Sequence, residues 1–142
     1  MQNAKVAQKA IKNGFSLIEL VIVIAITAIL GTIAVPAFNA IQNRAKETAL
    51  KSSAQALQIG IEAYAMATGK YPNTDTEIDT LMQDLQTNSA LDKSIRNPFT
   101  GANCTASDSS GKITYSYNNQ TNTYTISVYG QGNRTVIETL QN

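Results

Sequence analysis

The sequence predicts an α+β protein in which one long N-terminal helix packs part of its length on a small antiparallel β-sheet of about three strands. Two observations predict this class. Residues 15–35 form an almost uninterrupted apolar run, and a helical spacing of apolar residues continues beyond it to residue 68. The last third of the chain alternates polar residues with β-branched and aromatic ones, which is the period of strands.

The chain begins with a short basic segment, residues 1–14, which has three lysines and no acidic side chain. Positive charge beside an apolar run stays in the cytoplasm, so we expect a cytoplasmic N-terminus and export of the rest. A secretory signal peptide is a weaker alternative, because its apolar core is shorter and ends at a small-residue cleavage site. A plain single-pass anchor accounts for the lysines and the run, but it gives no role to Glu19.

Residues 15–36 are long enough to cross a bilayer, since a helix of this length spans roughly 30 Å. The apolar run contains one carboxylate, Glu19. A carboxylate costs about 2–3 kcal/mol in such a span and therefore needs a partner. A cut between Gly14 and Phe15 would supply one, because it creates an α-amino group one helical turn before Glu19. That amine could belong to the same chain or to a neighbouring subunit.

Gly31 and Pro36 predict a bend in this helix. Both residue types are tolerated in membrane-spanning helices. A proline inside a helix removes one hydrogen bond and clashes with the preceding turn, so we expect a kink around residues 32–36.

The helix continues through residues 37–68, where apolar residues recur every three to five positions and form one stripe. A sheet must cover this stripe to keep it from water. Gly69 and Pro72 end the helix. Over residues 15–68 it would be about 80 Å long, so part of it must protrude from the globular domain. We expect the sheet to pack across Leu50–Tyr64. The stripe consists of Ile41, Ala45, Ala49, Leu50, Ala54, Leu57, Ile61 and Tyr64.

Residues 69–111 connect this helix to the sheet. A short helix over residues 77–85, capped by Thr74 or Asp75, accounts for a cluster of apolar residues at helical spacing. The acidic residues of this region match no calcium loop. A proline–glycine turn is expected at residues 97–101.

Residues 112–142 should form the antiparallel sheet, with strands over residues 112–117, 123–129 and 134–140. Residues 118–122 link the first two strands as a hairpin loop. One face of the sheet should cover the helix stripe. That face contains Ile113, Tyr115, Ile126, Val128 and Val136.

The composition argues against several classes of function. Among 142 residues there are 11 basic and 10 acidic side chains and no histidine. This balance does not indicate a nucleic-acid binder. We find no nucleophile–base pair and no metal-ligand spacing, so we expect no enzyme, no cofactor and no metal. The one cysteine, Cys104, lies in a small-residue segment, residues 102–111, that we expect to be a mobile loop with an accessible free thiol.

The seven residues that start at Gly14 read GFSLIEL, and the apolar helix follows them. This order resembles the N-terminal signature of bacterial type IV pilins and pseudopilins, whose precursors carry a class III signal sequence. The resemblance implies that a membrane-embedded prepilin peptidase removes the leader, cutting between Gly14 and Phe15 and methylating the Phe15 amine. Glu19 would then neutralise the N-terminus of a neighbouring subunit. Residues 15–36 would form the filament core, and residues 37–142 the globular head.

For the whole protein, the resemblance implies a structural subunit of a type IV pilus. The cytoplasmic (inner) membrane would hold the apolar helix until an assembly ATPase, acting through an inner-membrane platform protein, adds the subunit to a helical homopolymer. Adhesion, twitching motility or DNA uptake would be properties of that extracellular fimbrium. In the filament, the helix between Gly31 and Pro36 would be locally extended.

Two alternatives stay open. The first is a major pseudopilin of a type II secretion system, which forms a short periplasmic filament that pushes out substrates. Such proteins usually carry a calcium-binding loop near the C-terminus, and the segment Gly130–Asn133 has no acidic residue, so we favour the pilus. The second is a membrane-anchored binding module, which leaves the Gly14–Phe15 junction and Glu19 without a role.

Overall fold

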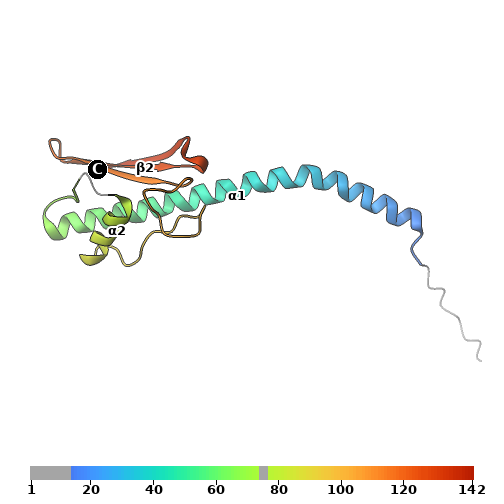
Figure 1. Ribbon diagram of the computed structural model, residues 1–142, viewed down its shortest axis with the longest axis horizontal. Coiled ribbons are helices and arrows are strands. Elements are labelled where there is room, and N and C mark those ends of the chain that lie inside the picture. The colour runs from blue at the N-terminus through green and yellow to red at the C-terminus, as the bar shows by residue number, and fades with distance from the viewer. Residues whose placement is uncertain (1–13, 74–76) are drawn as a thin grey trace, which may run out of the picture. The chain divides into compact units, whose positions relative to one another are not determined.

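The structure is a computed structural model that describes residues 14–73 and 77–142. The described residues form two α-helices, a short 3-10 helix and three strands, in the α+β arrangement that the sequence predicts (Figure 1). The chain divides into one compact unit up to Asn39 and a second from Ala40 to Asn142. The elements are α1 (Leu17–Thr68), α2 (Ile78–Thr87), β1 (Ile113–Asn118), β2 (Thr123–Tyr129), η1 (Gln131–Asn133) and β3 (Val136–Gln141).

The part of α1 that lies in the second unit buries one narrow stripe of side chains. These residues follow one another at intervals of four, three and four, which keeps them on one side of a helix. Each is completely buried. Burial of a leucine or isoleucine side chain contributes about 1.5–3 kcal/mol. The stripe consists of Leu50, Ala54, Leu57 and Ile61.

The prediction that Leu50–Tyr64 is covered is confirmed, but the predicted stripe began too early in the helix. Ala45 and Ala49 are exposed, and Ile41 keeps 65 % of its surface exposed. The step from Ala49 to Ala54 covers five residues, which turns about 140° around a helix, so the two alanines face different sides. The prediction was wrong for these first three residues because an interval of five does not preserve a face.

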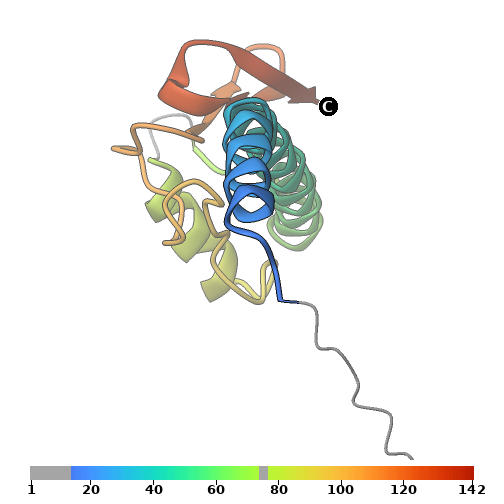
Figure 2. The same cartoon turned by 90° about the vertical axis from the view of Figure 1, so that its right-hand side faces the viewer.

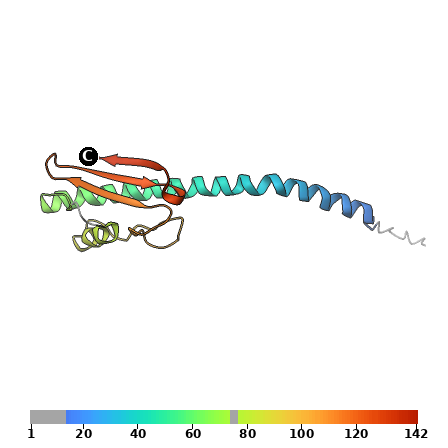
Figure 3. The same cartoon turned by 45° about the horizontal axis from the view of Figure 1, so that its top comes forward.

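The three strands form one antiparallel sheet in the order β1-β2-β3. Figures 2 and 3 show the sheet along the head part of α1, with α2 on another side of that helix. β1 and β2 pair Ile113 with Val128 and Tyr115 with Ile126. These four side chains are buried, as predicted. The sheet, α1 and α2 therefore enclose one core between them.

Val136 was also expected on the buried face of the sheet, and this expectation was wrong. A β-bulge at Val128 and Tyr129 shifts the register between β2 and β3, so that Tyr129 pairs with Val136. Val136 is 47 % exposed, whereas Ile137 and Leu140 pack against the core. An irregularity of one residue in a strand exchanges the side chains that face inward and outward.

The short helix α2 lies close to its predicted place at residues 77–85. Glu77 takes the N-cap position, and its side chain makes no capping hydrogen bond to the described backbone. The caps expected from Thr74 or Asp75 lie outside the described residues. The predicted apolar residues are all buried, and they are Ile78, Leu81, Met82 and Leu85.

The segment around Cys104 packs into the core, contrary to prediction. Cys104 N donates to the Ile95 carbonyl oxygen at 2.8 Å, and Arg96 and Asn103 form an isolated β-bridge. This pairing accompanies an inward Cys104 side chain, which is 1 % exposed. Burial, helped by the negative charge of Asp108, raises the pKa of the thiol to about 12. The expectation of an accessible thiol was wrong because it rested on composition. Composition cannot reveal that the segment around Asn103 pairs with the segment around Arg96.

Tyrosine side chains gather around Glu62 of α1. Tyr124 Oη donates to Glu62 Oε1 at 2.6 Å, and Tyr71 Oη donates to Glu62 Oε2 at 3.2 Å. The Tyr71 and Tyr124 ring centroids are 5.1 Å apart. Burial, together with the hydrogen bond to Glu62, raises the pKa of Tyr124 to about 12. These contacts join the C-terminal part of α1 to β2.

Candidate functional site

Gly14, Phe15 and Glu19 lie close to one another in the chain, at the start of α1. Gly14, Phe15 and Ser16 precede the helix, whose first residue is Leu17. Phe15 is 88 % exposed, and a Cβ on Gly14 would meet no atom within 4 Å. The described part of the chain therefore places no steric demand for glycine at this position. A demand for glycine would come from a partner that approaches the backbone closely.

Glu19 caps the helix to which it belongs. Ser16 N donates to Glu19 Oε2 at 2.8 Å, and Leu20 N donates to Ser16 O at 3.2 Å. Ser16 is thus the N-cap and Glu19 the third helical residue, the positions at which an acidic side chain returns to the N-cap amide in a capping box. The carboxylate also lies at the positive end of the helix dipole. Glu19 has a local partner in the uncleaved chain.

Ser16 is the site residue that the sequence reasoning missed. The sequence did contain a signal for it. A capping box has a serine followed three residues later by a glutamate, just before an apolar run. A cut between Gly14 and Phe15 would leave the new amine one residue before the Ser16 N–H. The carboxylate would then have a neutral donor and a charged donor within one turn.

The α1 residues that follow Glu19 expose apolar side chains over a long stretch. α1 contains an 18-residue window of mean hydropathy 2.6, none of it buried, and is long and apolar enough to cross a membrane. Its threonines do not interrupt this surface. Thr27 Oγ1 donates to Val23 O at 2.9 Å, and Thr32 Oγ1 donates to Ile29 O at 2.7 Å. Hydroxyls that are satisfied by their own backbone need no partner in lipid.

Gly31 and Pro36 both lie inside α1, which is helical through both positions. A Cβ on Gly31 would meet no atom within 4 Å, so packing within the described subunit does not require this glycine. The kink expected at residues 32–36 stays a prediction.

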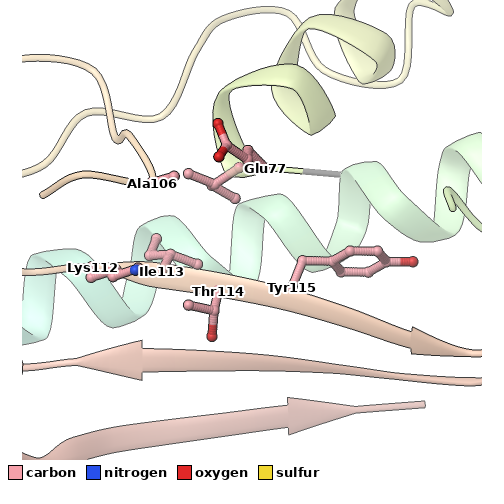
Figure 4. A pocket seen from close by; sticks show the side chains of 7 residues that line it. Glu77, Ala106, Lys112, Ile113, Thr114 and Tyr115 are labelled. Carbon is pink, nitrogen blue, oxygen red and sulfur yellow. The ribbon is translucent and has the colours of Figure 1, made fainter. Parts of the chain in front are cut away.

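A hollow in the head lies between the start of α2 and the outer edge of β1 (Figure 4). Its volume is about 280 Å³. Glu77 and Lys112 supply the charged groups among the described side chains around it, and they form no nucleophile–base pair. Across residues 14–73 and 77–142, no three acidic or cysteine side chains gather as a metal site would require.

Two family descriptions match the chain. The description "Prokaryotic N-terminal methylation motif" matches residues 9–35, and "Type II secretion system (T2SS), protein G" matches residues 38–140. The second match covers well over half of the chain. The chain belongs to the type II secretion system protein G family.

Curated relatives agree with this assignment to the protein G family. The chain is 31 % identical over 75 residues to a type II secretion system core protein G of Aeromonas hydrophila. It is 29 % identical over 76 residues to the protein of the same description from Pseudomonas aeruginosa. The matches cover 53 % and 54 % of this chain and 52 % and 54 % of the relatives, so the chain spans about half the length of the curated relatives it matches. No solved structure matches the chain significantly.

The protein G family is a structural family of secretion-system pseudopilins. The expected kinship with pilins and pseudopilins is therefore confirmed, and the comparisons support the pseudopilin alternative better than a pilus subunit. The family is not one of enzymes, which agrees with the expectation for this chain.

The calcium loop that the pseudopilin resemblance implies does not fit the residues near Gly130–Asn133. Calcium takes about six to eight oxygen ligands, several of them from carboxylates. Glu47 Oε1 lies close to Gly130, and Asn133 Nδ2 donates to the main-chain carbonyl oxygen of Asp108. Asp108 Oδ2 already accepts hydrogen bonds from Asn97 Nδ2 and Thr105 N. The absence of an acidic residue from Gly130–Asn133 led us to favour a pilus subunit, whereas the family match is to protein G.

Proposed function

We propose that this protein is the major pseudopilin of a type II secretion system, a structural subunit that polymerises into a periplasmic filament. The observation that carries the proposal is the combination of a protein G head with an N-terminal methylation motif on one chain. No catalytic step is assigned to it.

The inner membrane stores the subunit before assembly, with the leader in the cytoplasm. The exposed apolar surface of α1 supports this step, because lipid is the environment in which such a surface is stable. Residues 15–36 are the membrane and filament-core segment, and residues 37–142 are the head. Within the head, helix 37–68 is followed by a connecting region at residues 69–111 and a sheet region at residues 112–142.

A prepilin peptidase removes the leader by cutting between Gly14 and Phe15, and the Phe15 amine becomes methylated. The exposed side chain of Phe15 and the open surroundings of Gly14 support access of an enzyme to this junction. After cleavage, the amine is the positive partner for a glutamate whose one hydrogen bond among the described residues comes from the Ser16 N–H.

Assembly pairs the Phe15 amine of one subunit with Glu19 of its neighbour. Apolar surface is buried in lipid before assembly and among helices after it, so the hydrophobic effect contributes little to the difference. The charge pair supplies attraction and fixes the axial register in a medium where charges interact strongly. A head-to-tail contact of this kind does not close and therefore propagates into a helical filament. An assembly ATPase and its platform protein in the inner membrane supply the work.

The head part of α1 offers a further contact surface along the filament. Ile59 and Met66 are 70 % and 86 % exposed, and with Ala63 they follow the spacing of one helix face. An exposed apolar face on a soluble head indicates contact with other protein. This face supports helix-to-helix packing that extends beyond the membrane segment.

Two measurements test the proposal. Mass spectrometry of the native protein should find a methylated Phe15 at its N-terminus, and an N-terminus at Met1 would contradict processing. Deletion of the gene should abolish release of folded proteins into the medium while surface fibres stay unchanged. Loss of surface fibres with normal secretion would favour the pilus subunit instead.

A further inference from the structure

We propose that the side-chain amide of Asn133, and not a bound cation, closes the connection between β2 and β3, so that the head folds without calcium. The inference concerns how the head is held together and goes beyond the proposed role in secretion. The groups involved are Asn97, Asp108, Ser110 and Asn133, which we call the Asn133 clasp.

Asn133 bridges two segments that are distant from it in the chain. Its Nδ2 donates to the Asp108 carbonyl oxygen at 2.6 Å, and its Oδ1 accepts from Lys112 N at 3.1 Å. Asn133 has a φ of 52°, a left-handed conformation that asparagine tolerates better than most residues. Next to it, Gly132 N donates to Ser110 Oγ at 2.9 Å. The connection after β2 is thus pinned to the segment that leads into β1.

Asn97 fixes the same segment from the other side. It is completely buried, and its Nδ2 donates to Asp108 Oδ2 at 2.8 Å and to the Ser110 carbonyl oxygen at 2.7 Å. Its Oδ1 accepts from Phe99 N at 2.9 Å, which forms a turn. Buried amides are stable only when their donors and acceptors are paired, and here both ends of Asn97 are paired.

The oxygens of this arrangement are already paired with hydrogen-bond donors. The N–H donors of Asn97 and Asn133 point at the oxygens that would otherwise serve as ligands. A cation would have to displace hydrogen bonds that already satisfy these oxygens, and it would meet the positive ends of amide dipoles. In this head, hydrogen bonds from the neutral side-chain amides of Asn97 and Asn133 hold the β2–β3 connection to the segment before β1.

The test is thermal unfolding of the purified mature protein in detergent, followed by circular dichroism, in excess EDTA and in excess calcium chloride. Two substitutions remove the clasp without straining the backbone. Asn133→Gly keeps the freedom to adopt a positive φ, and Asn133→Asp keeps the side-chain shape but loses the donor to Asp108 O. Asn119→Gly is the matched control, because Asn119 is exposed and has no hydrogen bond with the described residues.

We expect the wild-type Tm to be the same in EDTA and in calcium. Both Asn133 variants should melt roughly 5–15 °C lower in either buffer, and the control should stay within a few degrees of wild type. If an Asn133 variant fails to fold while the control folds, the clasp is supported as well. A calcium-dependent rise of the wild-type Tm, or Asn133 variants as stable as the control, would overturn the inference. Secretion assays report on the proposed function separately, because a metal-free head can belong to a filament of any role.

Discussion

Substitution of Glu19 by glutamine removes the negative charge at the start of α1 and keeps an acceptor for the Ser16 N–H. Substitution by alanine removes both. The pair of variants therefore separates helix capping, which the structure shows at 2.8 Å, from charge pairing with a neighbouring Phe15 amine, which is the proposed assembly step. The capping box accepts glutamine as well as glutamate at this position.

The two roles differ in magnitude. A hydrogen bond such as Ser16 N to Glu19 Oε2 contributes about 0.5–1.5 kcal/mol, and only the alanine variant loses it. Two charges about 4 Å apart attract with about 1 kcal/mol in water and about 4 kcal/mol at an effective dielectric constant near 20. Loss of the pair should weaken addition of a subunit by roughly fivefold to a thousandfold. Both variants lose the attraction between Glu19 and the Phe15 amine, so charge pairing predicts that both assemble equally poorly.

The assay compares wild type, Glu19→Gln and Glu19→Ala in cells. The membrane fraction should contain similar amounts of all three, since removal of a charge from an apolar span does not hinder insertion. Mass spectrometry of that fraction confirms that each variant is cleaved before its assembly is judged. Chemical cross-linking should then give a ladder of oligomers for wild type only. A glutamine variant that forms the ladder as wild type does, beside an alanine variant that does not, would show that Glu19 acts through the cap and refute charge pairing.

Three further predictions concern the head. Deletion of residues 1–42 should give a soluble, folded domain by circular dichroism, because the stripe from Leu50 to Ile61 is covered within the head; aggregation would contradict this. The Cys104 thiol should resist alkylation at neutral pH until the head is unfolded, since burial and the raised pKa keep it protonated and inaccessible; rapid labelling of folded protein would refute the burial. The pKa of Tyr124 is raised from 10.0 to about 12, so its contribution to stability is complete below pH 10.0 and declines as the pH rises through about 12. Tyr124→Phe should make the Tm fall less steeply over that interval, and an unchanged pH profile would count against the shift.

Local patterns predicted much of this protein. The four apolar residues of α2 are all buried, and three strands occur where alternation predicted them. The GFSLIEL segment led to the pilin and pseudopilin family before any comparison, because the signature consists of adjacent residues that can be recognised without the fold. The same segment also contained the pattern for the capping hydrogen bond from Ser16 N to Glu19, which the sequence analysis overlooked.

The preference for a secretion pseudopilin over a pilus subunit rests on a different kind of evidence. The family match over residues 38–140 supports the pseudopilin alternative, although the segment Gly130–Asn133 lacks acidic residues. The hydrogen bonds of Asn133 explain how such a head holds its connection between β2 and β3 with amides. Sequence alone could not show this, because the partners lie 21 and 25 residues away.

The sequence by itself determined the membrane-length helix and the set of strands, and it carries the signature on which the proposed cleavage at Gly14–Phe15 rests. Each of these features depends on a pattern of residues that lie within a few positions of one another in the chain. The tertiary structure alone decided that Cys104 turns into the core and that Val136 turns out of it. These outcomes depend on a bridge between two loop segments and on a bulge between two strands, and such contacts form only when distant parts of the chain meet.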